Sequence, residues 1–70
     1  MADITERLRV LRAEKKLSQQ VVADSARISL RGYRNIENGE STPSIESLVQ
    51  LADFYGVTVD YLIGRSEERR

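Results

Sequence analysis

The sequence predicts one small all-α domain of five short helices. Apolar residues recur at three- and four-residue spacing along the chain. The single proline, Pro43, and most of the four glycines fall at the ends of these periodic segments, where they interrupt no helix. Seventy residues bury a modest fraction of their surface, so the core must be compact and each helix well capped. Short helices with short connections favour a globule over an elongated bundle.

Each predicted helix begins after a polar residue that can accept a hydrogen bond from the first turn. These residues are Asp3, Ser18, Ser29, Ser44 and Thr58. The residues expected to face inward, in chain order, are Ile4, Leu8, Leu11, Val22, Ala23, Ala26, Tyr33, Ile36, Ile45, Leu48, Leu51, Ala52 and Tyr55.

The predicted helices end at cations or at residues that tolerate left-handed backbone. The first should end near residues 15–16, two lysines whose charge suits the negative helix terminus. Asn38-Gly39 should close the third helix, and Gly56 and Gly64 the fourth and fifth.

Residues 1–64 are therefore expected to form the domain, followed by a frayed polar tail over residues 65–70. The chain has no cysteine and no histidine, which removes disulfides, thiolate metal sites and the commonest general base. Without a glycine-rich phosphate loop or a nucleophile–base pair, we expect no enzyme, metal, cofactor or small-molecule ligand. No apolar run reaches membrane-spanning length and no signal peptide is evident, so we expect a cytoplasmic protein.

The net charge is zero, but the charges are unevenly distributed. Residues 9–36 carry seven positive and two negative side chains, whereas residues 40–70 carry three positive and six negative ones. Attraction to phosphate depends on the local field, so the N-terminal half can form a basic face on a neutral molecule. An ordinary solvated charge pattern explains the same distribution equally well.

The most informative stretch is Leu17 to Gly39, LSQQVVADSARISLRGYRNIENG. It predicts two short helices joined by a tight turn. The second would expose Leu30, Arg31, Arg34 and Asn35 on one side and offer Tyr33 and Ile36 to the core on the other. The major groove of DNA is wide enough for one helix of this kind.

This stretch, with LRAEKKLSQ at its start and TPSIESLVQLADFYGVTVDYLIG after it, resembles the helix-turn-helix domains of phage Cro and lambda-type repressors and their bacterial relatives, the Xre family. Ala23 occupies the position where the two helices cross, Ile28 and Ser29 open the third helix, and IENG closes it. The resemblance covers nearly the whole chain. It implies a compact, five-helix, lambda-repressor-like domain that binds double-stranded DNA and regulates transcription.

Two positions depart from the family pattern. Family members often carry glycine at the position of Arg27, so either Arg27 adopts a positive φ at a cost of roughly 1 kcal/mol, or the turn has a different shape. Ala26 replaces a larger aliphatic residue, and Tyr33 can refill the lost volume.

The expected DNA contacts begin on the second helix. The resemblance places Gln19 against a phosphate, where it steadies the first residue of the next helix; an ordinary solvent-facing glutamine is the alternative. Gln20 is a weaker candidate. Leu30 can meet a thymine methyl group, and Arg31 can bind the O6 and N7 of guanine, although a phosphate contact is nearly as plausible for Arg31.

The remaining candidates follow Arg31. Arg34 would reach backbone or base, and Asn35 could pair with adenine. Gly32 either permits closer approach to DNA or is a tolerated weak position. The resemblance places the next loop along the DNA backbone, partly through main-chain N–H groups. The complete set of expected DNA-binding residues is Gln19, Gln20, Ser29, Leu30, Arg31, Gly32, Arg34, Asn35, Asn38 and Ser41.

Two further expectations concern structure and assembly. The resemblance places Arg12 and Glu37 together as an ion pair between the first and third helices. It also implies a homodimer on a palindromic operator. Some of Val59, Tyr61 and Ile63 would form the exposed pairing surface, or else they would complete the core.

The sequence therefore predicts a sequence-specific transcriptional regulator, most simply a repressor that occupies its operator. The alternative is a protein-interaction module of the same fold, of antitoxin or anti-regulator type, with DNA binding secondary. Zero net charge and Glu40 favour the alternative, whereas Arg31 and Arg34 favour DNA.

Overall fold

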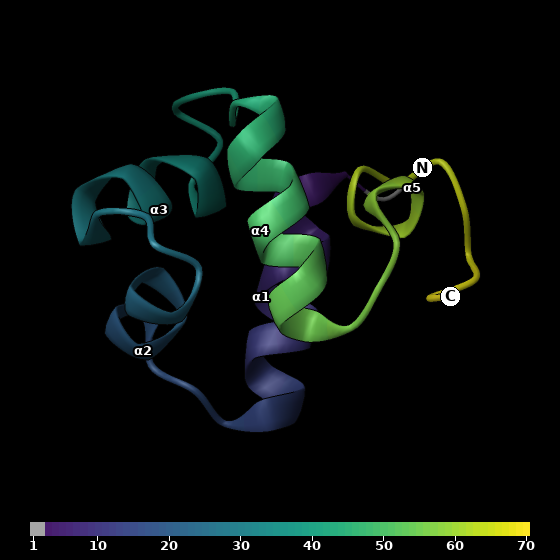
Figure 1. Cartoon of the computed structure of the whole chain (residues 1–70), viewed down its shortest axis with the longest axis horizontal. Helices are drawn as coiled ribbons and strands as arrows, with labels where there is room; N and C mark the ends of the chain where they lie inside the picture. The colour runs from purple at the N-terminus through teal and green to yellow at the C-terminus, as the bar shows by residue number, and fades with distance from the viewer. Residues whose placement is uncertain (1–2) are drawn as a thin grey trace.

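The computed structural model describes residues 3–70, which form five helices and no strand. The helices are α1 (Ile4–Lys15), α2 (Gln19–Ser25), α3 (Leu30–Glu37), α4 (Ile45–Tyr55) and α5 (Val59–Leu62). Helix α4 runs across α1, with the α2–α3 pair on one side and α5 on the other (Figure 1). The predicted all-α, five-helix architecture is confirmed.

The same local rules set both ends of every helix. Each N-cap side chain accepts a hydrogen bond from the amide three residues later, at 3.0 to 3.1 Å. After each helix comes a residue with positive φ, and the next amide bonds back to a carbonyl five residues earlier at 2.8 to 3.1 Å. The positive-φ residues are Lys16, Arg27, Gly39, Gly56 and Gly64. This pairing satisfies the terminal polar groups that a short helix would otherwise leave free.

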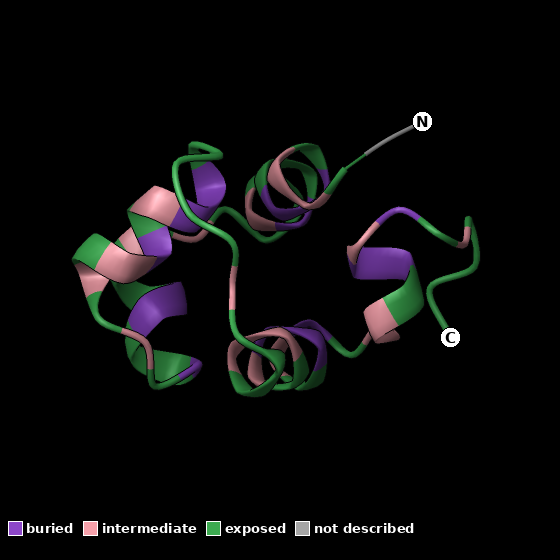
Figure 2. Cartoon of the chain, turned by 90° about the horizontal axis from the view of Figure 1, so that it is seen from above, coloured by how far each residue is buried: buried purple, intermediate pink, exposed green. Residues whose placement is uncertain are grey.

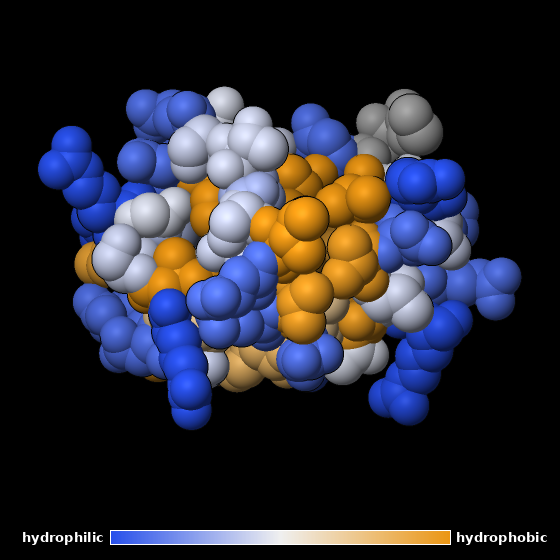
Figure 3. Space-filling model, turned by 45° about the horizontal axis from the view of Figure 1, so that its top comes forward, coloured by the Kyte–Doolittle hydropathy of each residue, from blue (hydrophilic) through white to orange (hydrophobic). Residues whose placement is uncertain are grey.

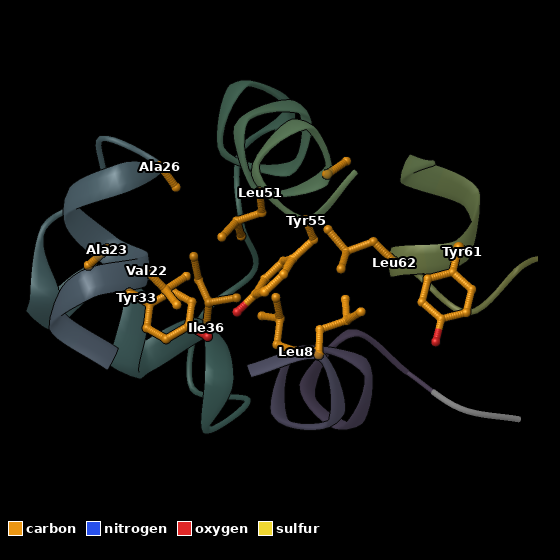
Figure 4. Close-up of a cluster of buried hydrophobic side chains, with 12 residues drawn as sticks. Leu8, Val22, Ala23, Ala26, Tyr33, Ile36, Leu51, Tyr55, Tyr61 and Leu62 are labelled. Atoms are coloured by element: carbon orange, nitrogen blue, oxygen red, sulfur yellow. The ribbon is translucent and has the colours of Figure 1, made fainter. Parts of the chain in front are cut away.

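The core fills the space between α1, α4 and the α2–α3 pair. Leu8, Val22, Tyr33, Leu51 and Leu62 are fully buried within it. The buried sides of the helices turn toward the middle of the molecule (Figure 2), and side chains from all five helices meet there (Figure 4). Such a core must be filled by contributions from every helix, because no single helix of this length can bury its apolar side alone.

Ile45 is a correction to the predicted core. It shares a helical stripe with Leu48, Ala52 and Tyr55, yet 81 % of its surface is exposed. Burial falls along α4 toward its N-terminus: Leu51 is completely buried, Leu48 is half-buried, and Ile45 is exposed. The first turn of α4 extends beyond the other helices, so periodicity continues where the core has ended.

The C-terminal segment corrects a second expectation, because residues 65–70 are not frayed. The amide of Thr58 donates to the carbonyl of Arg69 at 2.8 Å. The Arg69 guanidinium donates to both carboxylate oxygens of Glu14, at 2.8 and 2.7 Å, and so ties the segment to α1. A backbone hydrogen bond and a bidentate ion pair hold this segment against the domain.

Tyr61 is one of three residues considered for an exposed pairing surface, but it is buried. The Arg7 guanidinium stacks over its ring at 4.0 Å from the centroid, and that of Arg69 lies 5.2 Å away. Two cations over one ring cover the residue by cation–π packing. Val59 and Ile63 remain half-exposed.

Within residues 3–70, no helix has the length and apolar character needed to cross a membrane. The same residues hold no group of three or more Asp or Glu side chains placed to bind a metal ion.

Candidate nucleic-acid interface

The α2–α3 pair packs through a small residue, Ala23, and is joined by a strained turn. Val22 and Ala23 of α2 are fully buried, and the small side chain of Ala23 lets α3 approach closely. The turn closes with a hydrogen bond from the Ile28 amide to the Ala23 carbonyl at 2.9 Å. Arg27 has a φ of 59°, so of the two alternatives for the turn the structure has the arginine with positive φ. A left-handed arginine costs about 1–2 kcal/mol, so packing of α2 on α3 must offset that strain.

Helix α3 has one packed side and one solvent side. Tyr33 and Ile36 are buried in the core, whereas Arg31 and Arg34 are exposed. The two arginines lie three residues apart, so they are neighbours on the same helix surface. The helix therefore presents two guanidinium groups to solvent from a rigidly packed backbone.

Leu30 is less exposed than the sequence predicts. It is half-buried and packs against the core cluster, so only part of its side chain can reach a partner. Asn35 is half-buried, and its main-chain carbonyl accepts hydrogen bonds from the main-chain amides of Glu40 at 2.8 Å and Ser41 at 3.3 Å. The side chains of Leu30 and Asn35 thus offer less exposed surface for a DNA contact than the sequence predicts.

Ser29 and Gly32 act together at the start of α3. The Ser29 hydroxyl accepts a hydrogen bond from the Gly32 amide at 3.0 Å. A Cβ atom at Gly32 would lie 3.0 Å from that same hydroxyl oxygen. A side chain at position 32 would therefore crowd the cap, but the other four helices form the same cap with a residue that carries a side chain at the equivalent position, so the cap does not require glycine.

The loop after α3 has fewer free main-chain N–H groups for a DNA phosphate than expected. The amide of Asn38 donates to Arg34, that of Gly39 to Ile36, and those of residues 40–41 to Asn35. These main-chain donors are already used within the protein. The exposed side chains of Asn38 and Ser41 are what remain for a contact.

Arg12 and Glu37 form a bidentate ion pair between α1 and the end of α3. Arg12 Nη2 donates to Glu37 Oε1 at 2.8 Å, and Arg12 Nε donates to Oε2 at 3.0 Å. The Glu37 side chain is 3 % exposed and that of Arg12 26 % exposed. Burial, the largest single effect, pushes the pKa of Glu37 upward, but the hydrogen bonds and charge of Arg12, together with Gln19 and the nearby Tyr33 hydroxyl, outweigh burial and hold that pKa below its ordinary value.

The ion pair extends toward the solvent side of α3 through Gln19. The Gln19 Nε2 group donates to Glu37 Oε1 at 3.3 Å, and its Oε1 accepts from Arg34 Nε at 3.2 Å. The side-chain hydrogen bonds of Gln19 thus go to Glu37 and Arg34, and none goes to the first residue of α3. Gln20 is exposed and donates to Asp24 at 2.8 Å within its own helix.

Two tyrosine hydroxyls lie buried beside this ion pair. Neither the hydroxyl of Tyr33 nor that of Tyr55 has a hydrogen-bond partner of regular geometry. The rings come from α3 and α4 and point toward one another (Figure 4). Burial, the principal cause, raises the pKa of both hydroxyls above the ordinary value, so both stay neutral.

Comparison with known proteins agrees with this geometry. Residues 8–62 match the family described as Helix-turn-helix. The chain belongs to the helix-turn-helix family. It is 38 % identical over 65 residues to AnsR, an HTH-type transcriptional regulator of Bacillus subtilis, covering 93 % of this chain and 56 % of AnsR. It is 40 % identical over 62 residues to the cryptic phage CTXphi transcriptional repressor RstR of Vibrio cholerae, covering 89 % of this chain and 55 % of RstR.

The fold is also that of a solved repressor. The P22 c2 repressor, crystallised in complex with synthetic operator 9T, matches with a TM-score of 0.86 at 24 % identity, over 94 % of this chain and 100 % of that one. The lambda-repressor-like fold is therefore confirmed. The chain spans a little more than half the length of AnsR and RstR.

Sequence reasoning about this helix-turn-helix domain missed the contacts that depend on how helices cross. The link from Arg34 to Gln19 joins residues 15 positions apart, and the stack of Arg7 on Tyr61 joins α1 to α5. Arginine and glutamine at such separations carry no periodic signal. Only the α2–α3 and α1–α5 packing brings them within reach.

Proposed function

We propose that this chain is a sequence-specific, double-stranded DNA-binding transcriptional regulator that represses by occupying its operator, with α3 in the major groove. The carrying observation is the pair of exposed arginines, Arg31 and Arg34, on a helix whose opposite side is buried through Tyr33 and Ile36. Guanidinium groups on a rigid helix suit both guanine edges and phosphates. Such a role needs no catalytic group, and relatives named as transcriptional regulators support it.

Charge supports the same orientation. Glu37, the one carboxylate within α3, is neutralised by Arg12 and turned away from solvent. Arg27 in the turn, Arg31 and Arg34 are all exposed. The solvent side of α3 would therefore present positive charge to the phosphates, although the whole chain has no net charge.

The proposal includes a homodimer on a palindromic site. The longest extent of the domain is 27 Å, less than the ~34 Å that separates successive major grooves on one side of a duplex. One copy therefore covers one half-site. Apolar residues available for pairing are Val59 on α5, Ile63 directly after α5, and Ile45 and Val49 on α4. Figure 3 shows apolar side chains gathered on one face of the molecule.

Selection of bound duplexes from a random pool tests the proposal. We expect an enriched palindrome, and Arg31→Ala should relax the preference at one base pair in each half-site. Uniform weakening on all sequences would instead make Arg31 a phosphate anchor. Absence of any complex at low ionic strength would overturn DNA binding altogether.

The dimer is tested separately by sedimentation. Ile63→Glu should lower the dimer fraction and reduce affinity for the palindrome more than for an isolated half-site. Val10→Glu, on the exposed side of α1, is the matched control. Equal effects on both duplexes would contradict the assignment of Ile63 to the dimer surface.

A second candidate is a protein-interaction module of the same fold. The 81 % exposure of Ile45 and the exposed carboxylate of Glu40 beside α3 favour it. The two functions differ in salt dependence, because binding driven by phosphate contacts weakens steeply as salt rises. A complex with a protein partner that persists at high salt, with no DNA complex at low salt, would support this candidate.

A further inference from the structure

A chain of side-chain hydrogen bonds connects the buried ion pair to the solvent side of α3. Glu37 is 2 % exposed, Gln19 is half-buried and Arg34 is exposed. The Gln19 amide bridges the other two residues, with 3.3 Å to Glu37 and 3.2 Å to Arg34. The three residues therefore form a path from the core to the proposed DNA surface.

The chemistry of the path allows only one direction for the amide. An ionised carboxylate only accepts hydrogen bonds, so the Gln19 NH₂ group must face Glu37. The Gln19 oxygen then faces outward, where it accepts from the Nε of Arg34, which can only donate. Because Arg12 keeps Glu37 ionised, the core ion pair sets the polarity of the whole path.

We propose that Gln19 is a positioning residue that orients Arg34 for DNA recognition. It holds the Nε of Arg34 and leaves the two terminal amino groups of that guanidinium to contact the duplex. An unrestrained arginine loses rotamer freedom when it binds, whereas one already held loses less. This inference rests on the proposed function, since it assumes that α3 meets DNA.

Arg31 provides an internal comparison. It lies on the same helix, three residues before Arg34, and it is also exposed. No side-chain hydrogen bond joins Arg31 to another of the described residues. Arg31 and Arg34 therefore carry equal charge on one surface, but only Arg34 is held in place by a neighbour.

A double-mutant cycle on the palindrome selected as above tests the coupling. Gln19→Met keeps the length of the side chain and removes both hydrogen bonds. We expect Gln19→Met and Arg34→Ala each to weaken binding. The loss of affinity in the double variant should be smaller, by a factor of about three or more, than the product of the two single losses. Gln19→Met with Arg31→Ala should give simple multiplication. Multiplication in both cycles would overturn the inference.

A measurement on the free protein separates this inference from the proposed function. Solvent exchange of the Nε proton of Arg34, followed by NMR, should be slow in the parent chain and accelerate in Gln19→Met. The Nε proton of Arg31 should exchange quickly in both. Equal exchange for Arg34 in the two proteins would overturn the positioning role, whereas failure to bind any duplex would overturn the function and leave the exchange result standing.

Arg34→Lys guards against a Gln19 variant that does not fold. It changes an exposed side chain, keeps the charge and lacks a guanidinium Nε. We expect it to lose affinity for the selected palindrome by about as much as Arg34→Ala, while binding to random duplex falls much less. Full retention of affinity for the palindrome would show that holding the guanidinium is unimportant.

Discussion

Glu37→Gln removes the charge from the most deeply buried carboxylate in the fold. The parent side chain receives three donors: Arg12 Nη2 and Gln19 Nε2 on Oε1, and Arg12 Nε on Oε2. Glutamine keeps one acceptor oxygen, so its NH₂ group must face at least one of these donors. The substitution therefore breaks an ion pair and leaves a donor without an acceptor in a site that is 3 % exposed.

The magnitude follows from burial. Removing one partner of a buried ion pair costs about 3–5 kcal/mol. Arg12 remains 26 % exposed, so water can solvate part of its guanidinium after the change. We therefore expect a loss of about 2–3 kcal/mol, below the fully buried range. For a domain of this size each kcal/mol shifts the melting temperature by about 4–8 °C, so Tm should fall by about 10–20 °C.

The pH dependence gives a second test with a definite sign. The pKa of Glu37 is lower in the folded chain than its ordinary value of 4.5. Its contribution is therefore complete above pH 4.5 and is lost as pH falls through the folded-state pKa. The gap in stability between the parent and Glu37→Gln should be widest at neutral pH and should narrow on acidification.

Thermal unfolding followed by circular dichroism at several pH values measures both effects. Glu14→Gln is the matched control, because Glu14 also pairs with an arginine but is 46 % exposed, and exposed pairs contribute little. A Tm unchanged by Glu37→Gln, or a gap that does not narrow below about pH 4, would refute the reasoning.

Three further predictions, the last of them with a paired control, test other features. Arg27→Gly should raise stability by up to about 1 kcal/mol, because glycine removes the steric cost of φ at 59° but loses more backbone freedom on folding; a lower Tm would contradict strain in the turn. Tyr55→Phe should leave the free energy of unfolding within about 1 kcal/mol of the parent or raise it, because the hydroxyl has no hydrogen-bond partner of regular geometry; a larger loss in denaturant titration would reveal a strong bond there. Arg7→Ala should cost about 1–2 kcal/mol through loss of stacking on Tyr61, whereas Glu67→Gln, 90 % exposed, should change Tm little. Equal losses for these last two would assign the effect to the ion pair instead.

The sequence by itself determined the helices and all of their ends except the turn at Arg27. Capping residues act on amides three residues away, and the positive-φ residues close bonds over five residues, so both signals are local. The inward residues of α1, α2 and α3 also followed from periodicity, because those stripes lie opposite one another across the core. These local signals were enough to predict five helices and the exposed arginines of α3.

Tertiary structure decided what periodicity cannot see. Ile45 continues the stripe of α4 but projects past the core, and Tyr61 is buried because Arg7 and Arg69 stack on it. The path from Glu37 through Gln19 to Arg34 exists only because α2 packs on α3, where Ala23 is fully buried. The physical reason is range: a cap or a stripe depends on neighbours within a few residues, whereas burial and side-chain contact depend on where distant segments come to rest.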